Sequence, residues 1–430
     1  MVRLWMNDFD DDGWGEPNSV NPYFNEIATH SYSVGSDFDH SNPRTKDYTK
    51  RVIDRWVNDF KIDGFRWDLT KGFTQQCTAN DESCTNSYRS DRVAILKEYA
   101  DHSWSLDPDH YVIFEHLGDN EEEKEWADYR VNEGKGIMLW GKMNNPYNQL
   151  TMGYSSGTDI SGMGHNSRGF NEPRLVGYPE SHDEERLMYK NLEFGNSSNS
   201  SHDVTDLNTS IKRMSALGAV SLTIPGPKMI WHFTELGMEN SIYTCSDGSV
   251  NTPSDAATGD CKLDTKPQPQ WENNWLANAD RSQVYNDWSR LNDLKVNEAV
   301  FEGDYTITSG NLTPKIYIFD NTIPATELKN VVILANFDVT TQNVVPDFPY
   351  TGTWYDLMDD TYNTSINVTN TSSPITIPAG EFKIYGNAVP QTLSNTEADI
   401  ADTFKLYPNP ALSSFKSDSL LVLYSSTTSL

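Results

Sequence analysis

The chain has 430 residues, enough for two or three domains, and its formal net charge is −29. Such an excess of acidic side chains argues against binding to nucleic acid, which needs clustered Lys and Arg, and against binding to anionic membrane surfaces. The charge is compatible with a neutral polymeric ligand or with solubility alone, and the 12% of aromatic residues could stack on sugars or fill a core.

The predicted elements begin after a loop-like stretch, residues 1–44, which is rich in Gly, Pro, Asn and Asp. Within it, DFDDDG (8–13) is similar to the start of an EF-hand loop but lacks the glutamate at the twelfth position, so we interpret it as an acidic loop. Apolar periodicity predicts helices at 45–61, 91–104 and 205–218, and strands within 64–68, 111–115, 136–140, 174–181 and 219–232. Alternating helices and strands favour a parallel α/β sheet.

From residue 294 onward the pattern changes to short β runs separated by turn residues. The runs are YTITSG, PKIYIFDN, NVVILANFDV, GTWYDLMD, SINVTN and EFKIYGN. This spacing favours an antiparallel β-sandwich over residues 294–388. Residues 389–404 then have the composition of a linker.

Three of the predicted strands lead into acidic residues. GFRWD places Arg66 two residues before Asp68, which puts both side chains on one side of an extended backbone. YVIFE ends in Glu115, and RLVGYPES is followed by His182 and Asp183. Because an α/β barrel keeps its chemistry at the carboxyl ends of its strands, these acids predict an active site. Arg66 would hold Asp68 ionised, as a nucleophile requires, and apolar neighbours would raise the pKa of Glu115.

The four cysteines form two local pairs, Cys77 with Cys84 and Cys245 with Cys261. Local disulfides are predicted because short loops close most easily, and a zinc site is disfavoured because the spacings lack the CxxC form. Disulfides would indicate an oxidising compartment. No apolar run has membrane-spanning length, and the N-terminus carries no hydrophobic signal core.

These motifs together resemble the α-amylase family of glycoside hydrolases, glycoside hydrolase family 13. GFRWDLTKG, IFEHLG and ESHDEE are similar to its second, third and fourth conserved regions. TIPGPKMIWHFTELG (223–237) resembles its last barrel strand, and DFDH (37–40) resembles the region that closes its inserted B domain. The resemblance covers residues 15–290, and the overall pattern looks most like secreted α-amylases of Bacteroidetes-type bacteria.

The resemblance implies a (β/α)8 TIM barrel at 45–293, preceded by the end of a B-domain-like insertion at 1–44 and followed by the β-sandwich C domain. KLYPNPA (405–411) is similar to the opening of the sorting domain read by the type IX secretion system. Residues 405–430 are therefore interpreted as a remnant of that sorting tail. The resemblance places the parent protein outside the cell or at its surface, with the secretion machinery as a partner.

One family feature has no counterpart in this sequence. The first conserved region, which contains Asp, Asn and His at a strand end, is missing, and about five strands can be counted, whereas a closed barrel needs eight. We therefore expect an α/β fold with a partial barrel made of about the last five strands, in a chain truncated at its N-terminus. Such a chain, expressed as given, is expected to be inactive or barely stable.

The resemblance assigns roles to the strand-end residues. It implies that Asp68 is the nucleophile, Glu115 the acid/base, and that Asp183 holds sugar hydroxyls. Substrate contacts are implied for Arg66, Lys71 and His182. Lys71 could equally be a solvated lysine, and a His-Asp pair also occurs in metal-dependent phosphohydrolases, although those need further histidines at helical spacing.

Calcium is implied by two further positions. Asp37 resembles a B-domain aspartate that binds the ion, and Gly72 stands where many members have a histidine whose backbone carbonyl is a ligand. Calcium prefers six to eight oxygens, so two candidates leave its binding open.

The function implied is retaining endo-hydrolysis of α-1,4-glucosidic bonds in starch-like polysaccharides by a monomer. Branching enzymes and other transglycosylases share the three acids and are one alternative. A non-catalytic glucan-binding protein or an inactive fragment is another, which the intact acids disfavour and the missing strands favour.

Overall fold

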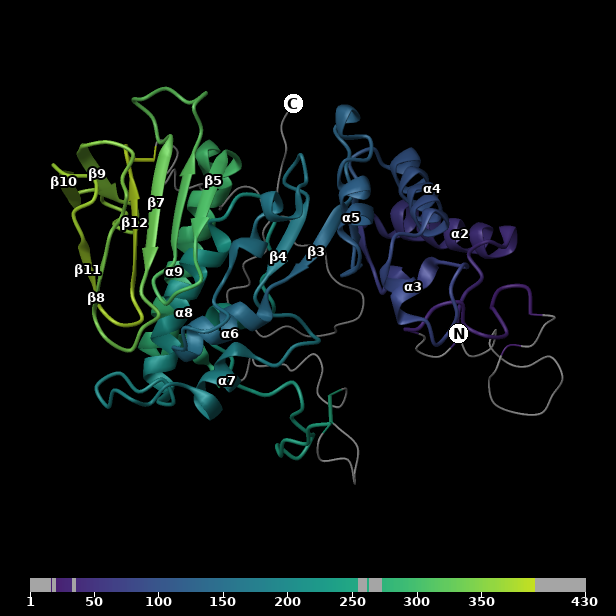
Figure 1. Cartoon of the computed structure of the whole chain (residues 1–430), viewed down its shortest axis with the longest axis horizontal. Coiled ribbons are helices and arrows are strands. Elements are labelled where there is room, and N and C mark those ends of the chain that lie inside the picture. Colours follow the sequence, from purple (N-terminus) through teal and green to yellow (C-terminus); the bar gives the residue numbers. More distant parts are fainter. Residues whose placement is uncertain (1–16, 18–20, 33–35, 254–260, 263–272, 391–430) are drawn as a thin grey trace, which may run out of the picture. The chain divides into compact units, whose positions relative to one another are not determined.

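The computed structural model describes residues 17, 21–32, 36–253, 261–262 and 273–390 (Figure 1). The acidic loop at 8–13, the sorting-tail region and nearly all of the predicted linker lie outside the described residues. The helices are α2 (Pro43–Phe60), α3 (Glu82–Asn86), α4 (Ser90–Leu106), α5 (Asn120–Ala127), α6 (Asn144–Met152), α7 (Leu187–Phe194), α8 (Leu207–Leu222) and α9 (Ala279–Asn297). The strands are β1 (Gly64–Trp67), β2 (Tyr111–Phe114), β3 (Met138–Lys142), β4 (Leu175–Tyr178), β5 (Asp304–Thr308), β6 (Lys315–Phe319), β7 (Asn330–Ala335), β8 (Gln342–Val344), β9 (Gly352–Asp356), β10 (Ser365–Val368), β11 (Ile375–Ile377) and β12 (Phe382–Gly386).

The first four strands form one parallel sheet in the order β1-β2-β3-β4. Its register pairs Arg66 with Ile113, Ile113 with Met138, and Leu139 with Leu175. Helices lie between successive strands in the chain, as the sequence pattern predicts, and each parallel connection needs such a crossover. All four strands therefore end at the same edge of the sheet.

Local sequence signals explain where the helix before β1 begins and ends. The Asn42 side chain accepts a hydrogen bond from the Arg44 backbone N–H, and Pro43 occupies the first turn, where its missing N–H costs nothing. At the other end Lys61 adopts a left-handed conformation with φ of 55°, and the chain then enters β1. The helix buries Ile53 and Val57 as the apolar periodicity predicts.

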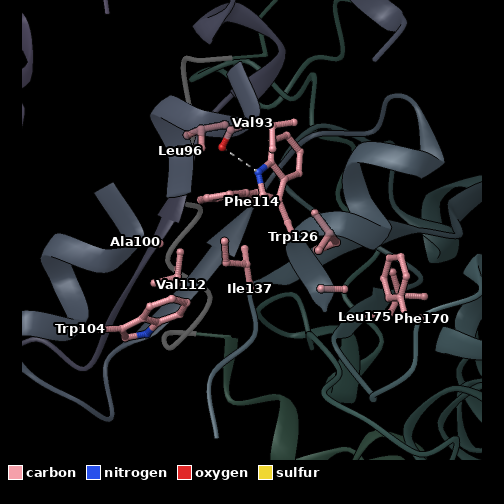
Figure 2. Close-up of a cluster of buried hydrophobic side chains, with 12 residues drawn as sticks. Val93, Leu96, Ala100, Trp104, Val112, Phe114, Trp126, Ile137, Phe170 and Leu175 are labelled. Carbon is pink, nitrogen blue, oxygen red and sulfur yellow. Dashed lines mark hydrogen bonds between the residues drawn. The ribbon is translucent and has the colours of Figure 1, made fainter. Parts of the chain in front are cut away.

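The core of the parallel sheet lies between its strands and the helices α4 and α5. Figure 2 shows Phe114 of β2 beside Trp126 of α5, whose indole N–H donates to the backbone carbonyl of Val93 at 3.5 Å. The members are all at least nine-tenths buried: Val93, Leu96, Ala100, Trp104, Val112, Phe114, Trp126, Ala127, Ile137, Leu139, Phe170 and Leu175. This cluster packs β2 and β3, whose carboxyl ends lie near the acids, against α4 and α5.

The expected fifth strand, within 219–232, is reduced to one parallel bridge between Gly177 and Lys228. The Gly177 N–H donates to the Pro227 carbonyl at 3.3 Å, and the Met229 N–H donates to the Gly177 carbonyl at 3.1 Å. Pro225 and Pro227 lack an N–H, so no longer ladder can form. The prediction was also wrong at 219–222, which belong to the end of α8.

The last part of the described chain, from β5 to β12, is the predicted antiparallel β-sandwich. A six-stranded sheet has the order β10-β9-β12-β7-β6-β5, and β11 pairs with β8 in a second sheet. Val332 and Trp354 of the larger sheet share one buried cluster with Val344 and Ile377 of the smaller one. The strands β8 and β11 were not predicted, and α9 continues past residue 294, so the first strand begins only at Asp304.

Among the described residues, no helix combines the length and the apolar character needed to cross a membrane.

Candidate active site

The three predicted acids lie after three strands of the parallel sheet. Asp68 comes directly after β1, Glu115 directly after β2, and Asp183 in the segment that follows β4. Parallel strands present their carboxyl ends at one edge, so all three acids belong to that edge. The strand β3 lies between β2 and β4 and separates the third acid from the first two.

Arg66 joins the first two acids. Its Nη1 pairs with Oδ1 of Asp68, and its Nη2 lies 2.9 Å from Oε2 of Glu115. The Asp68 side chain is 77% exposed, whereas the Glu115 side chain is only 16% exposed. The predicted contact between Arg66 and Asp68 is confirmed, and the contact between Arg66 and Glu115 is an addition that strand alternation alone did not predict.

Burial raises the pKa of Glu115 above its ordinary value, the direction the sequence predicts. The Leu69 backbone N–H, which donates to Oε2 at 3.0 Å, and the charge of Arg66 both oppose this shift. Asp68 raises the pKa further, through a side-chain hydrogen bond and through repulsion. The two carboxyl groups are therefore neighbours in different environments, since Glu115 is largely buried and Asp68 is exposed.

Two aromatic residues that sequence reasoning did not single out connect this pair to the third acid. The Trp140 ring of β3 lies 4.0 Å from Cζ of Arg66, a cation–π contact, and 6.1 Å from the His182 ring. Tyr178 packs edge-on against Trp140 at 5.2 Å. Burial raises the pKa of Tyr178, and so do the charges of nearby acids that include Glu115 and Asp183. Trp140 is the last residue of the strand predicted at 136–140, so a search for functional residues at strand ends could have identified it.

The third acid is half exposed and lies among basic groups. Asp183 Oδ1 is 2.8 Å from Nζ of Lys262, and its Oδ2 is 3.3 Å from Nε2 of His182. The disulfide between Cys245 and Cys261 links Cys261, the residue directly before Lys262, to another segment of the chain. No local pattern could have predicted a lysine so far along the chain at this place.

A buried polar network supports the segment that carries Asp68 and Glu115. Thr70 donates its N–H and its hydroxyl to the Glu115 carbonyl, both at 2.9 Å, and its hydroxyl lies 3.2 Å from Nδ1 of His116. His116 Nε2 is 2.8 Å from Glu122, which also accepts from Arg92 at 2.6 Å. His116, Glu122 and Arg92 are all fully or almost fully buried. These contacts fix the backbone at Thr70 and Glu115, next to the two acids.

A family comparison decides which family this fold belongs to. The model of the α-amylase catalytic domain matches residues 3–301, more than half of the chain. The chain belongs to the α-amylase family of glycoside hydrolases. Comparison with curated protein sequences gives no significant match.

Solved structures show the fold of the same family at low sequence identity. The α-amylase of Geobacillus thermoleovorans in complex with acarbose is 14% identical with a TM-score of 0.57, over 89% of this chain and 73% of that one. An Anoxybacillus α-amylase is 14% identical with a TM-score of 0.53, over 84% and 66%. The apo pullulanase of Klebsiella pneumoniae is 12% identical with a TM-score of 0.57, over 86% and 48%. This chain thus spans under half of the pullulanase and about two thirds to three quarters of the two amylases.

The residues predicted to hold the family's calcium ion do not fit one. The buried Asp37 carboxylate accepts hydrogen bonds from the Asn25 amide at 2.8 Å and from the Thr29 N–H at 3.0 Å and hydroxyl at 3.1 Å. His30 Nε2 lies 3.2 Å from its other oxygen, so both oxygens are occupied. A Cβ at Gly72 would lie only 3.0 Å from His30 Nε2. The glycine therefore leaves room for the imidazole that bonds Asp37, and no metal-binding cluster of three or more His, Cys, Asp or Glu occurs in the described part of the chain.

Lys71 does not point freely into the site. Its Nζ lies 4.6 Å from the centre of the Tyr32 ring, and burial lowers its pKa, assisted by the charge of Arg92. Glu115 is close enough to oppose that shift. Lys71 therefore lines the side of the site near Glu115, and a sugar contact from it stays a prediction.

The predicted local disulfides are present. Cys77 and Cys84 have Cα atoms 5.8 Å apart, and Cys245 and Cys261 have Cα atoms 5.1 Å apart. Both separations are ordinary for a disulfide. No cysteine is left to bind zinc.

Proposed function

We propose that this chain carries the site of a retaining endo-hydrolase of α-1,4-glucans. The observation that carries the proposal is the pair of carboxyl groups bridged by Arg66, in which Asp68 is exposed and Glu115 is largely buried with a raised pKa. A glycosidase needs one carboxylate that attacks and one carboxylic acid that protonates the leaving oxygen.

Each residue has a defined role in the two steps of this reaction. Asp68 attacks the anomeric carbon, and the bond to the glycosidic oxygen breaks as Glu115 gives that oxygen its proton. Glu115 then takes a proton from water, the water oxygen attacks the anomeric carbon, and Asp68 leaves with its electron pair. Arg66 steadies the negative charge on Asp68, and Asp183 and His182 would hold sugar hydroxyls.

The test measures reducing ends released from soluble starch by Asp68→Asn, Glu115→Gln and Asp183→Asn variants of an active parent enzyme. Each variant is expected to lose nearly all activity, because general acid catalysis alone contributes about 10²–10⁴-fold. The control is Asp203→Asn, in the second His-Asp pair of the chain, where the carboxylate only caps a turn at Thr205. An Asp68 variant that keeps more than about a tenth of the parent turnover would contradict the proposal.

The same assay separates hydrolysis from transfer. Hydrolysis lowers iodine staining and creates new reducing ends, whereas a branching enzyme changes staining without creating them. Binding of starch with no change in either quantity would indicate a non-catalytic glucan-binding protein.

We also propose that the parent protein is secreted and monomeric, with the type IX machinery as its export partner. Two disulfides support an oxidising location. Fractionation of producing cells would test it, and recovery of the protein with reduced thiols from the cytosol would contradict it.

A further inference from the structure

The segment that carries His182 and Asp183 is a short connection between β4, which ends at Tyr178, and α7, which begins at Leu187. The side chains of His182 and Asp183 are 36% and 45% exposed. A connection at the surface moves easily unless its two ends are fixed. The proposed reaction needs Asp183 at a constant place, because small errors of position at a reacting centre are costly.

Glu180 joins the two ends of this connection. Its side chain is only 2% exposed, and its Oε1 accepts a hydrogen bond from the backbone N–H of Leu187 at 2.5 Å. The carboxylate and this N–H therefore close residues 181–186 into a ring. Leu187 is the first residue of α7, and the N–H groups of a first helical turn need acceptors from outside the helix. A negative carboxylate is a favourable acceptor at that end of a helix.

The second carboxylate oxygen of Glu180 ties the connection to the segment at 231–237. Oε2 accepts from the Thr234 hydroxyl at 2.5 Å and lies 3.5 Å from Nη1 of Arg186, which donates to the His232 carbonyl at 2.9 Å. Glu180, Arg186 and Thr234 are each 2% exposed. Burial lowers the pKa of Arg186, and the charge of Glu180 opposes that shift most. The buried arginine therefore depends on Glu180 as its counter-charge.

Contacts inside the connection carry this anchoring to Asp183. The Asp183 backbone N–H donates to the Ser181 hydroxyl at 3.2 Å, and that hydroxyl donates to Glu184. Glu184 Oε1 lies 2.8 Å from Nζ of Lys142, at the end of β3. Ser181 and Glu184 are both less than a tenth exposed. The backbone at Asp183 is thus held between two buried residues, and it follows the position of the residue that anchors them.

We propose that Glu180 is a positioning residue for Asp183. Because its side chain is buried, it acts through the backbone of residues 181–187 and not on a substrate. Its carboxylate fixes the connection where the Asp183 carboxylate can reach sugar hydroxyls beside the cleaved bond. This inference rests on the proposed function, to which it adds a buried acid that the three strand-end acids do not include.

The test measures maltoheptaose binding by calorimetric titration of an active parent enzyme that carries Asp68→Asn, which prevents turnover. Glu180→Gln keeps the length of the side chain but removes the counter-charge of Arg186. It should raise the dissociation constant about ten- to a hundredfold, the size of one lost hydrogen bond between a charged group and a hydroxyl. When Asp183→Asn is also present, Glu180→Gln should change the constant less than about twofold, because it acts through Asp183.

The outcomes separate this inference from the proposed function. Equal weakening with and without Asp183→Asn, or no weakening in either case, would overturn the positioning role and leave the proposed function standing. Fewer binding sites with an unchanged dissociation constant would mean that Glu180 only supports folding, and would overturn it in the same way. Absence of maltoheptaose binding before Glu180 is changed would overturn both.

Milder variants keep the inference testable if Glu180→Gln does not fold. Thr234→Val removes the hydroxyl that donates to Glu180 and should weaken binding about two- to tenfold, and Thr234→Ser should restore it. Asp356→Asn is the matched control, since this carboxylate of β9 is 12% exposed and accepts from the Met358 N–H at 3.0 Å but lies in the β-sandwich. It should leave the dissociation constant unchanged. Equal constants for Thr234→Val and Thr234→Ser would overturn the inference.

Discussion

At the scale of single residues, the difference between Asp68 and Glu115 carries the chemistry. One carboxyl is exposed and the other is largely buried, and the Arg66 guanidinium touches both. Strand alternation and strand-end position were enough to predict these residues. Trp140, Tyr178 and Lys262 complete the site through space, and His30 pairs with the Asp37 carboxylate that was expected to bind calcium. Contacts between segments so far apart have no local pattern, so sequence reasoning missed them.

Asp68→Asn should lower the pKa of Glu115, because the variant removes a neighbouring carboxyl that raises it by hydrogen bonding and by repulsion. Titration of the Glu115 carboxyl by carbon NMR measures this directly. Asp63→Asn, a change at an acid that does not act on Glu115, is the control. A pKa of Glu115 that stays constant or rises in Asp68→Asn would show that the two carboxyls do not interact.

The raised pKa also has a consequence for stability. Since the folded pKa of Glu115 lies above its unfolded value, its contribution to folding is present at low pH and is lost as the pH rises through the folded pKa. Asp37 behaves in the opposite way. Burial alone would raise its pKa, but hydrogen bonds from His30, Thr29 and Asn25 lower it, so its contribution is lost as the pH falls.

His30 should stabilise the buried Asp37 carboxylate in place of the calcium ion that the resemblance implies. We expect thermal unfolding of the chain to be the same with EDTA and with added calcium. His30→Ala should cost about 1–3 kcal/mol of unfolding free energy, because it removes a hydrogen bond from a buried carboxylate. His102→Ala is the control, since its partner Asp54 is a more exposed aspartate at 2.8 Å. A rise in unfolding temperature on adding calcium would contradict this account.

At the scale of elements, apolar periodicity predicted the helices and strands that pack against one another. It failed where prolines or very short strands, rather than the side-chain pattern, decide the hydrogen bonding. The helix predicted at 91–104 is α4, and the strand predicted at 136–140 is β3, shifted by two residues. The prolines at 225 and 227 reduced an apolar stretch to a single bridge. The short strands β8 and β11 pair with each other and carry too few residues for an alternating pattern.

The element that carries Glu115 depends on the buried Glu122. Glu122→Gln should cost about 3–5 kcal/mol of unfolding free energy, because it leaves the buried Arg92 without its counter-charge. Asp59→Asn breaks the exposed pair with Arg55 and should cost less than about 1 kcal/mol. Denaturant unfolding of both variants measures the difference. Equal losses would mean that Glu122 does not hold this network together.

At the scale of the whole molecule, the two sheets differ in how completely their strands are paired. In the described residues, β1 pairs only with β2, and β4 gains one bridge on its far side. The strand β7 is paired on both sides and buried along its length. Unpaired edges open easily and favour association.

Native-state hydrogen exchange should therefore be faster in β1 and β4 than in β7 and its neighbour β12. The comparison needs only the unmodified chain in dilute solution, and the β-sandwich strands serve as the internal control. Equal protection of the two sheets would show that the parallel sheet is as stable as the sandwich, against the expectation drawn from its open edges.

The most direct test of the central claim is the mass of the peptide that contains Asp68 after the Glu115→Gln variant of an active parent enzyme has reacted with maltosyl fluoride. Fluoride is a good leaving group and departs without protonation by an acid. Without Glu115 as a base, water cannot release the sugar from the enzyme, so the covalent intermediate accumulates after a single turnover. The account predicts a maltosyl group attached to Asp68. It predicts no labelled peptide for the double variant that carries both Glu115→Gln and Asp68→Asn. A label on another residue, or release of maltose without any label, would contradict the assignment of Asp68 as the nucleophile.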